Sequence, residues 1–455
     1  MVLGTHIQMK NRDALLILGT EKISKLLMQY ATPAIVAMVA TSLDNIIDGI
    51  FIGQGVGALA LSGLAITFPL LNLGAAFSTL VGVGASTLLS IKIGKKDYKT
   101  ANNILGNVVV LNLITGITVT LVALPFLNTI LCFFGASREI LPYAYNFIVI
   151  VLSGNVISHL YSGLNALLRS MGHPKKAMLA IIFSILINLV LNPLFIFGFG
   201  WGVRGSALAD IISQTLVLCW QLYLFSNENF FIRWQKGIYQ LKKKIVIDSL
   251  LIGLAPFIVH AGSCLIVVLI NKQLVRYGSD LAAGAYGIIN RVAFLFIMII
   301  MGLNQGMQPI VGYNYGAGQY DRVIAVLKQA VFYATFVMIV GFTVVELFPN
   351  MIVSMFTKEK QLKDIAVVGL RWIFVVYPLL GFQMVSSSFF LSIGDSWKSI
   401  ILSLTRQIIF LIPILFILPC YLGMLGVWVS MCIADFLSVL LAGVLLRKEL
   451  QTIML

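Results

Sequence analysis

Long apolar stretches follow one another along almost the whole chain, and segments such as 49–91 and 177–203 are nearly free of charged residues. A helix that crosses the hydrocarbon core of a bilayer needs roughly 20 mainly apolar residues. Only 11% of the 455 residues are charged, whereas a soluble protein carries about 25%. The chain is therefore expected to be an all-α integral membrane protein.

Twelve apolar segments are long enough to span a membrane. We predict membrane-spanning helices over 26–52, 59–90, 102–126, 140–168, 176–200, 204–226, 246–271, 281–312, 323–348, 365–392, 398–419 and 424–446. The first segment is too long for the apolar part of a cleavable signal peptide, so we expect it to be retained as a span.

Basic residues gather in alternate connections between these spans. Clusters occur within 92–99, 169–176 and 233–244, whereas the intervening connections are poor in lysine and arginine apart from 358–363. Because basic loops stay in the cytoplasm, we expect both termini there, in a multi-pass protein of the bacterial cytoplasmic membrane. The net charge of +14 then reflects topology and attraction to anionic lipid, and no nucleic-acid partner is expected.

The two halves of the chain share landmarks at an offset of about 222 residues. Pro33 matches Pro256, and Gly205 matches Gly426. Leucine and isoleucine match easily by chance in apolar sequences, but prolines and glycines that recur in order indicate an internal repeat.

This repeat predicts twelve transmembrane helices in two parallel six-helix lobes. We place the N-terminal lobe at 1–226, a cytoplasmic linker at 227–247 and the C-terminal lobe at 248–455. Lobes related in this way put a substrate path in a central cleft and expose it alternately to either side by rocking. The architecture therefore predicts a transporter.

Three aspartates fall inside predicted spans of the N-terminal lobe, at Asp44, Asp48 and Asp210. A charged side chain at the bilayer centre costs roughly 2.5–3.5 kcal/mol on insertion scales, so each needs a reason. Asp44 and Asp48 lie one helical turn apart and share a face. Two carboxylates so close in an apolar lobe cannot both ionise freely, which suits a proton carrier. Alternatively, Asp44 faces a water-filled cleft, or either residue lies near the outer interface.

Asp210 follows a run of small residues, 205–209, that lets another helix approach closely. The preceding span offers polar partners in Asn188 and Asn192, again one turn apart. Pro193 removes a backbone hydrogen bond there and can expose a carbonyl to a bound ion or water. These residues form either a functional site or a structural polar cluster.

Other polar residues within the predicted spans are harder to assign from sequence. The candidate substrate-cleft residues are Tyr161, His159, His260, Arg291 and Gln305. A structural role is as good an interpretation for Arg291, and also for Arg406 and Asp435. The chain has no GxxxxGK[ST] loop, no HExxH and no CxxC spacing among its five cysteines, so we expect no enzyme and no cofactor. An ion gradient is the energy source that remains.

Several motifs resemble one transporter family. Residues 45–53 read NIIDGIFIG, similar to the N-x-x-D-x-x-F-[VI]-G segment of MATE (multidrug and toxic compound extrusion) transporters. In the second half, 285–291 and 302–317 resemble the signatures of the seventh and eighth helices of that family. The resemblance covers nearly the whole chain.

Membership implies antiport of drugs against a cation, a proton or sodium, through the cleft. In the DinF-like branch the cation is held in the N-terminal lobe, at positions that fall on Asp48, Asn188, Asn192 and Asp210. Here asparagine stands at 192 where the branch usually has aspartate, and aspartate at 210 where threonine is common. We interpret this as the transfer of the second carboxylate of the site from the fifth span to the sixth, relative to the usual sequence of the branch.

NorM-like members carry their acidic coupling residues in the second lobe, where this chain has Asp435 and Glu346 within spans and Asp248 at the very start of one. The DinF-like branch is therefore preferred. In that branch the first span bends when the site changes occupancy, which assigns Pro33 as the hinge. We expect small amphiphilic, chiefly cationic substrates and a monomer.

Three other functions stay open. A lipid-linked oligosaccharide flippase of the same superfamily would be expected to have fourteen spans and a cationic cavity. A membrane transferase needs a catalytic cluster that the isolated histidines do not provide. A sensor or scaffold would have little use for three costly aspartates in the membrane.

Overall fold

The computed structural model describes residues 17–227, 230–357 and 359–454. The N-terminal lobe (N-lobe) contains α2 (Ile23–Gly55), α3 (Ala58–Gly94), α4 (Tyr98–Ala123), α5 (Leu127–Phe133), α6 (Leu141–Ser153), α7 (Asn155–Ser170), α8 (Pro174–Pro193), the π-helical turn η1 (Leu194–Gly198) and α9 (Gly202–Ser226). The C-terminal lobe (C-lobe) contains α10 (Lys243–Tyr277), α11 (Asp280–Gly316), α12 (Tyr320–Leu347), α13 (Pro349–Ser354), α14 (Lys360–Phe374), α15 (Tyr377–Ser392), α16 (Ser396–Leu404), the π-helical turn η2 (Thr405–Phe410), α17 (Leu411–Leu422) and α18 (Met424–Met454).

The predicted all-α membrane fold is confirmed. Within the described ranges, ten helices are long and apolar enough to cross a membrane, and the number becomes twelve when each of two bent pairs counts as one span. These pairs are α6 with α7, bent by 56°, and α14 with α15, bent by 53°. Both are the fourth span of their lobe, which the sequence analysis placed as single segments at 140–168 and 365–392.

The bend in the N-lobe has a local cause. It lies at Gly154, where the side chain of Ile211 from α9 fills the space that a Cβ atom would occupy. Glycine is a poor helix former because it loses the most backbone entropy on ordering, so the chain bends there at little cost.

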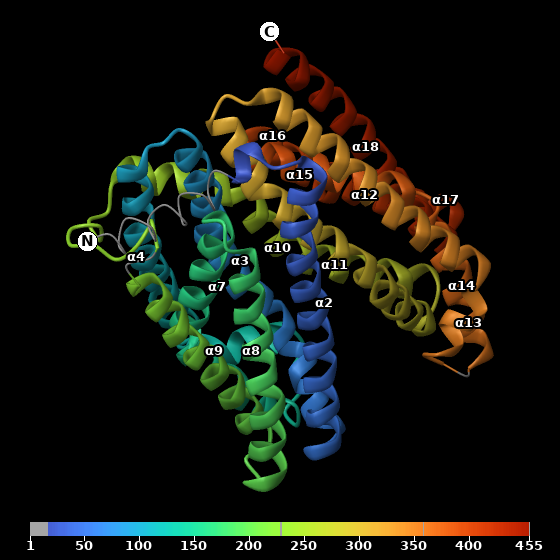
Figure 1. Ribbon diagram of the computed structural model, residues 1–455. Coiled ribbons are helices and arrows are strands. Elements are labelled where there is room, and N and C mark those ends of the chain that lie inside the picture. The colour runs from blue at the N-terminus through green and yellow to red at the C-terminus, as the bar shows by residue number, and fades with distance from the viewer. Residues whose placement is uncertain (1–16, 228–229, 358, 455) are drawn as a thin grey trace.

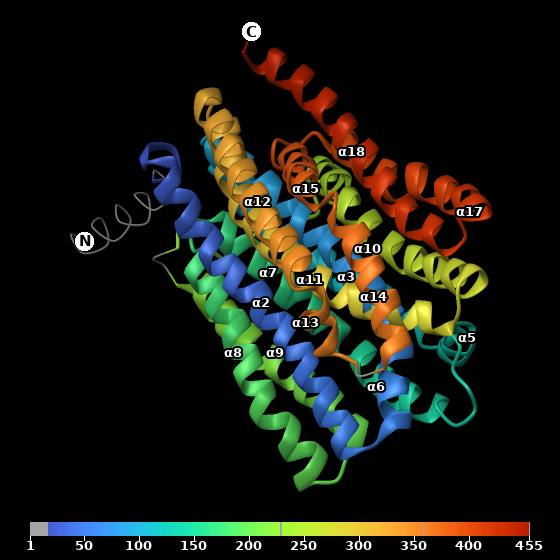
Figure 2. The same cartoon turned by 90° about the vertical axis from the view of Figure 1, so that its right-hand side faces the viewer.

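The two lobes are in contact at one end of the molecule and diverge toward the other (Figure 1). Figure 2 shows α2 and α8 side by side in the N-lobe, with α12, α14 and α18 in the C-lobe. The predicted linker, 227–247, follows α9, but its last residues already belong to α10, which begins at Lys243. We call the end with this linker the linker side.

Glycines bring the lobes together on the linker side. A Cβ atom on Gly253 of α10 would overlap the carbonyl oxygen of Leu80, and one on Gly84 of α3 would overlap that of Ser249. Backbones therefore touch where α10 begins and α3 ends. Gln308 of α11 adds polar contacts across this interface, to Ser86 and Thr87.

Each lobe also holds the segment that precedes the first helix of the other lobe. Ahead of α2, the carbonyl of Leu18 accepts hydrogen bonds from Asn314 Nδ2 at 2.9 Å and Arg322 Nη2 at 3.2 Å, both from the C-lobe. Ahead of α10, Asn107 of the N-lobe donates to the carbonyl of Gln240 at 3.0 Å and accepts from the backbone of Lys242 at 2.9 Å. These crossed contacts hold in place the segments that lead into α2 and α10.

Candidate functional site: carboxylates between α2, α8 and α9

The predicted N-lobe residues converge where α2 meets α8 and α9. Asn192 donates from Nδ2 to Asp48 Oδ1 at 2.5 Å, and this contact joins residues 144 positions apart. Asp48 also lies close enough to Asp44 and Asp210 to interact with both electrostatically. Asp44 and Asp48 come from one face of α2, and Asp210 from α9, so three helices meet at a concentration of negative charge.

A chain of polar side chains supports Asp210. Gln214, one turn further along α9, donates to Asp210 Oδ1 at 2.9 Å. The hydroxyl of Ser213 donates to the Asp210 carbonyl at 2.8 Å and lies 3.3 Å from the hydroxyl of Ser184 on α8. Tyr161 of α7 lies close enough to Ser184 to interact with it. Sequence reasoning missed Gln214, although its spacing of four residues from Asp210 could have indicated it.

Two asparagine side-chain oxygens at this site have no hydrogen-bond partner, and neither has Oε1 of Gln214. Oδ1 of Asn188 and Oδ1 of Asn192 are both buried and unpartnered in the described part of the chain. Buried polar atoms are usually paired, so each such atom calls for an explanation such as an ion or a water molecule. Amide and carboxylate oxygens are suitable ligands for a hard cation such as sodium.

The aspartates of this site have no basic partner. Among the residues that the structure describes, Asp44, Asp48 and Asp210 form no ion pair with a lysine, arginine or histidine. Over the same ranges, no group of three or more His, Cys, Asp or Glu side chains is arranged to hold a metal ion. The site can therefore offer a cation one or two carboxylates together with amide oxygens.

The five candidate substrate-cleft residues lie on α7, α10 and α11, and in the described part of the chain no hydrogen bond joins any two of them. His159 is 1% exposed inside the N-lobe, where its Nδ1 lies 3.4 Å from the hydroxyl of Thr115. Tyr161 belongs to the polar chain beside Asp210. His260 on α10 is half-buried and Arg291 on α11 is exposed. Gln305 lies at the contact between the lobes, with Nε2 3.4 Å from Met38 Sδ.

Pro33 is buried inside α2, fifteen residues before Asp48. Nearby, Gly302 and Gly306 of α11 pack directly on the backbone of Ile35 and Ala31. The half of α2 that contains Pro33 therefore contacts the C-lobe, whereas the half that contains Asp48 contacts α8. The hinge itself stays a prediction.

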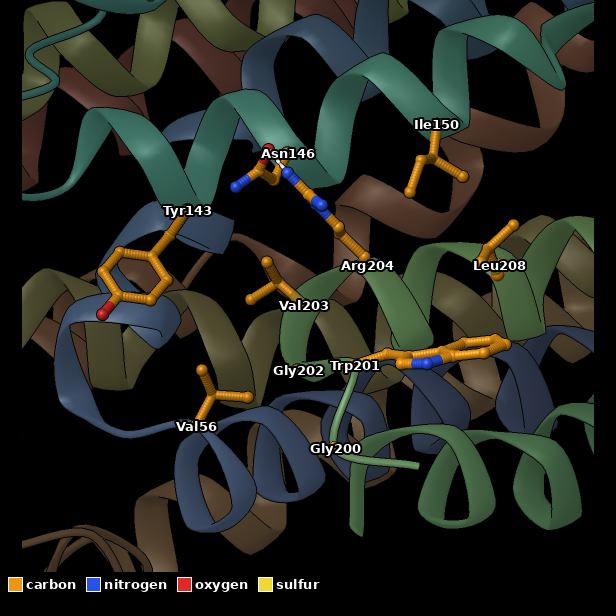
Figure 3. A pocket seen from close by; sticks show the side chains of 10 residues that line it. All are labelled: Val56, Tyr143, Asn146, Ile150, Gly200, Trp201, Gly202, Val203, Arg204 and Leu208. Atoms are coloured by element: carbon orange, nitrogen blue, oxygen red, sulfur yellow. Dashed lines mark hydrogen bonds between the residues drawn. The ribbon is translucent and has the colours of Figure 1, made fainter. Parts of the chain in front are cut away.

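A separate pocket opens at the end of the N-lobe opposite the linker. It has a volume of about 590 Å³ and lies between α6, the turn before α3 and the start of α9 (Figure 3). Arg204 points toward Asn146 and donates to its Oδ1 at 2.8 Å, with Tyr143 and Trp201 nearby. None of the predicted site residues lines this pocket.

The comparisons with known proteins agree with the repeat. A family model described as MatE matches residues 33–194 and 257–417, one segment in each lobe. The chain belongs to this family. MatE proteins are membrane transporters rather than enzymes, and the predicted resemblance is thereby confirmed; the DinF-like branch stays a prediction.

Individual relatives cover nearly the whole MatE chain. The multidrug export protein MepA of Staphylococcus haemolyticus is 26% identical over 420 residues, which cover 92% of each protein. A solved multidrug resistance MATE family transporter in an outward-facing conformation matches with a TM-score of 0.92 and 24% identity, over 97% of this chain and 98% of that one. A MATE structure in the straight conformation matches with a TM-score of 0.91 and 25% identity, over 96% and 98%.

Proposed function

We propose that this transporter exports small amphiphilic, chiefly cationic molecules in exchange for a proton or a sodium ion. The ion is held in the N-lobe by Asp48, Asn188, Asn192 and Asp210, with Asp44 beside them. The protein acts as a monomer in a bacterial cytoplasmic membrane, with both termini in the cytoplasm and no cofactor. The name of the MepA relatives, which are multidrug export proteins, supports the substrate class.

One observation carries the ion site. Asn192 links α8 to Asp48 of α2, while the two buried amide oxygens beside this contact have no partner. Burying a polar group without a partner is costly, and burying carboxylates without a countercharge is costlier still. A cation at this place removes both costs at once, which is why the arrangement favours cation binding over a purely structural role.

The same arrangement couples the ion to the substrate. With the ion bound, the negative charge of the three aspartates is partly neutralised and α2 is linked to α8 and α9 through a common ligand. With the ion released, that charge attracts a cationic substrate into the same lobe. Because the two cations compete for one set of carboxylates, the lobes exchange one for the other as they alternate.

The experiment is efflux of a fluorescent cationic dye from proteoliposomes, with proton and sodium gradients imposed separately. Wild-type protein should transport the dye under one of the two gradients, and that gradient identifies the coupling ion. The Asp48→Asn variant should lose gradient-driven efflux, because the amide keeps the shape of the side chain but removes its charge.

A matched control is Asp364→Asn, the same substitution at an exposed aspartate of α14. It should transport like wild type. Absence of efflux under both gradients in wild-type protein would contradict the multidrug proposal and favour the lipid-linked oligosaccharide flippase. Undiminished coupled efflux in Asp48→Asn would contradict the proposed ion site.

A further inference from the structure

In the part of the chain that the structure describes, two acidic residues of the C-lobe form ion pairs with arginines, unlike the three aspartates of the N-lobe site. Arg406 Nε lies 2.8 Å from Asp435 Oδ1, with side chains 26% and 18% exposed. Glu346 near the end of α12 lies 3.6 Å from Arg371 Nε of α14. In the described residues, two C-lobe acids within predicted spans, Glu346 and Asp435, thus have an arginine as a partner.

The internal repeat relates the Arg406–Asp435 pair to a contact in the N-lobe. The offset of about 222, which is 221 between Gly205 and Gly426, places the counterparts of Ser184 and Ser213 at or next to Arg406 and Asp435. Both pairs join the fifth and sixth spans of their lobe, the serine hydroxyls at 3.3 Å and the charged groups at 2.8 Å. One contact between two helices is therefore neutral in the N-lobe and an ion pair in the C-lobe.

The two sixth spans also treat their aspartates alike. Ser213 donates its hydroxyl to the carbonyl of Asp210, and Ser438 donates to that of Asp435, each at 2.8 Å and three residues further along. Asp435 is thus the C-lobe aspartate on the helix that corresponds to the one carrying Asp210. What differs is the partner, since Gln214 faces Asp210 whereas a guanidinium faces Asp435.

A local distortion accompanies the arginine. Arg406 lies in the π-helical turn η2, in the middle of the fifth span of the C-lobe. A π-helical turn inserts one residue into a helix and is frequent at functional sites. The groups that interact with Asp435 are Tyr286 of α11, Tyr377 of α15 and, from α18 itself, Cys432. Arg406 is therefore the only cationic partner of Asp435 in the described residues.

We propose that Arg406 is a built-in cation that occupies Asp435 permanently and so confines ion exchange to the N-lobe. This inference rests on the proposed function, and it adds a residue that sets how many exchangeable ions the protein holds. A guanidinium keeps its charge under all physiological conditions and does not leave. Asp435 therefore cannot exchange its countercharge, whereas Asp48 can.

It follows that removal of Arg406 creates a second open carboxylate. In Arg406→Gln, Asp435 keeps its place on α18 but loses its fixed cation and must take up a proton or a metal cation from solution. Arg406→Lys retains a positive charge at the same position and should leave Asp435 occupied.

The experiment is labelling of the purified full-length protein with a hydrophobic carbodiimide, which reacts with protonated carboxyl groups in apolar surroundings. Peptide mass spectrometry then gives the modified fraction of each aspartate. In wild-type protein we expect labelling at Asp48 and little at Asp435. In Arg406→Gln, labelling of Asp435 should rise severalfold, while labelling of Asp48 stays unchanged.

Two controls isolate the effect of the fixed charge. Arg406→Lys should label like wild type, and Arg371→Gln, which frees Glu346 instead, should leave Asp435 unlabelled. Labelling of Asp435 as strong as that of Asp48 in wild-type protein would overturn the proposal without any variant. So would an Asp435 that stays unlabelled in folded Arg406→Gln. Labelling needs no transport, so a failed efflux assay and a failed labelling assay are distinguishable.

Discussion

In each lobe a polar side-chain contact joins the fifth and sixth spans, at closely corresponding places in the repeat. In the N-lobe this contact consists of two serine hydroxyls, Ser184 and Ser213, beside Asp210, which forms no ion pair with a basic residue in the described part of the chain. In the C-lobe it consists of Arg406 and Asp435. The backbone arrangement has been kept while the charge balance has changed.

This difference indicates how a pseudo-symmetric transporter can divide its work. Unpaired carboxylates and orphaned amide oxygens are costly in an apolar lobe unless a ligand completes them. We propose that the N-lobe carries this cost because its site binds an exchangeable ion. The C-lobe avoids the cost at Asp435 with an internal salt bridge to Arg406.

The largest stability effect is expected at the paired contact. Arg406→Gln leaves Asp435 without its partner, and breaking an ion pair as largely buried as this one costs up to about 3 kcal/mol. The thermal unfolding midpoint in detergent should fall clearly while the protein remains folded. The double variant Arg406→Gln with Asp435→Asn should recover much of the loss, and a midpoint as low as that of the single variant would refute the pairing as the cause.

At the N-lobe site around Asp48, the expected effect is on the affinity for the coupling ion. Asn192→Leu removes both the hydrogen bond to Asp48 and one of the two orphaned oxygens. Losing a hydrogen bond to a charged group costs about 1.5–3 kcal/mol, equivalent to roughly 10- to 100-fold in affinity. With sodium as the coupling ion, the sodium concentration that half-saturates efflux should rise by this factor.

Asn112→Leu is the matched control for Asn192→Leu, since Asn112 is also a fully buried asparagine of the N-lobe but lies on α4. An unchanged ion requirement in Asn192→Leu, or an equal change in both variants, would argue against a local ion site.

The crossed contacts that precede α2 and α10 allow a reciprocal test. Arg322→Gln weakens the hydrogen bonds to the carbonyls of Leu18 and Glu21, at a cost of about 1.5 kcal/mol. Trypsin should then cut faster after Lys22, with the linker unchanged. Asn107→Ala should do the opposite, speeding cleavage after Lys242 alone. Equal effects on both segments would mean general loosening instead.

The smallest effect is expected at the neutral contact. Ser184→Ala removes a hydroxyl–hydroxyl hydrogen bond of 3.3 Å, worth about 1 kcal/mol or less. The unfolding midpoint should shift much less than in Arg406→Gln. A comparable shift would show that the two contacts carry similar energies and would remove the contrast between the lobes.

Much of this fold could be predicted because the composition and length of apolar segments are enough to identify membrane spans. The twelve apolar segments and the repeat marked by Pro33 and Pro256 needed no tertiary information. The bend at Gly154 could not be predicted, because it depends on Ile211 approaching from another helix. The crossed contacts of Arg322 and Asn107 were missed for the same reason, since their acceptors are backbone carbonyls, which carry no sequence signal.

The candidate site was only partly predictable. Helical spacing placed Asp44 with Asp48 and Asn188 with Asn192, and the family resemblance related them across helices. The partner of Asp435 could not be chosen from sequence, because three arginines lie within predicted spans of the same lobe, Arg291, Arg371 and Arg406. The structure settles the choice with the 2.8 Å contact to Arg406, while Arg291 is exposed.

The most direct test of the central claim compares gradient-driven dye efflux in two variants that neutralise one lobe each. Asp48→Asn removes the open charge of the N-lobe. Arg406→Gln with Asp435→Asn removes the paired charges of the C-lobe. The account predicts that the first variant loses coupled efflux and that the second keeps it. Loss of coupled efflux in a folded C-lobe variant, with Asp48→Asn still coupled, would contradict it.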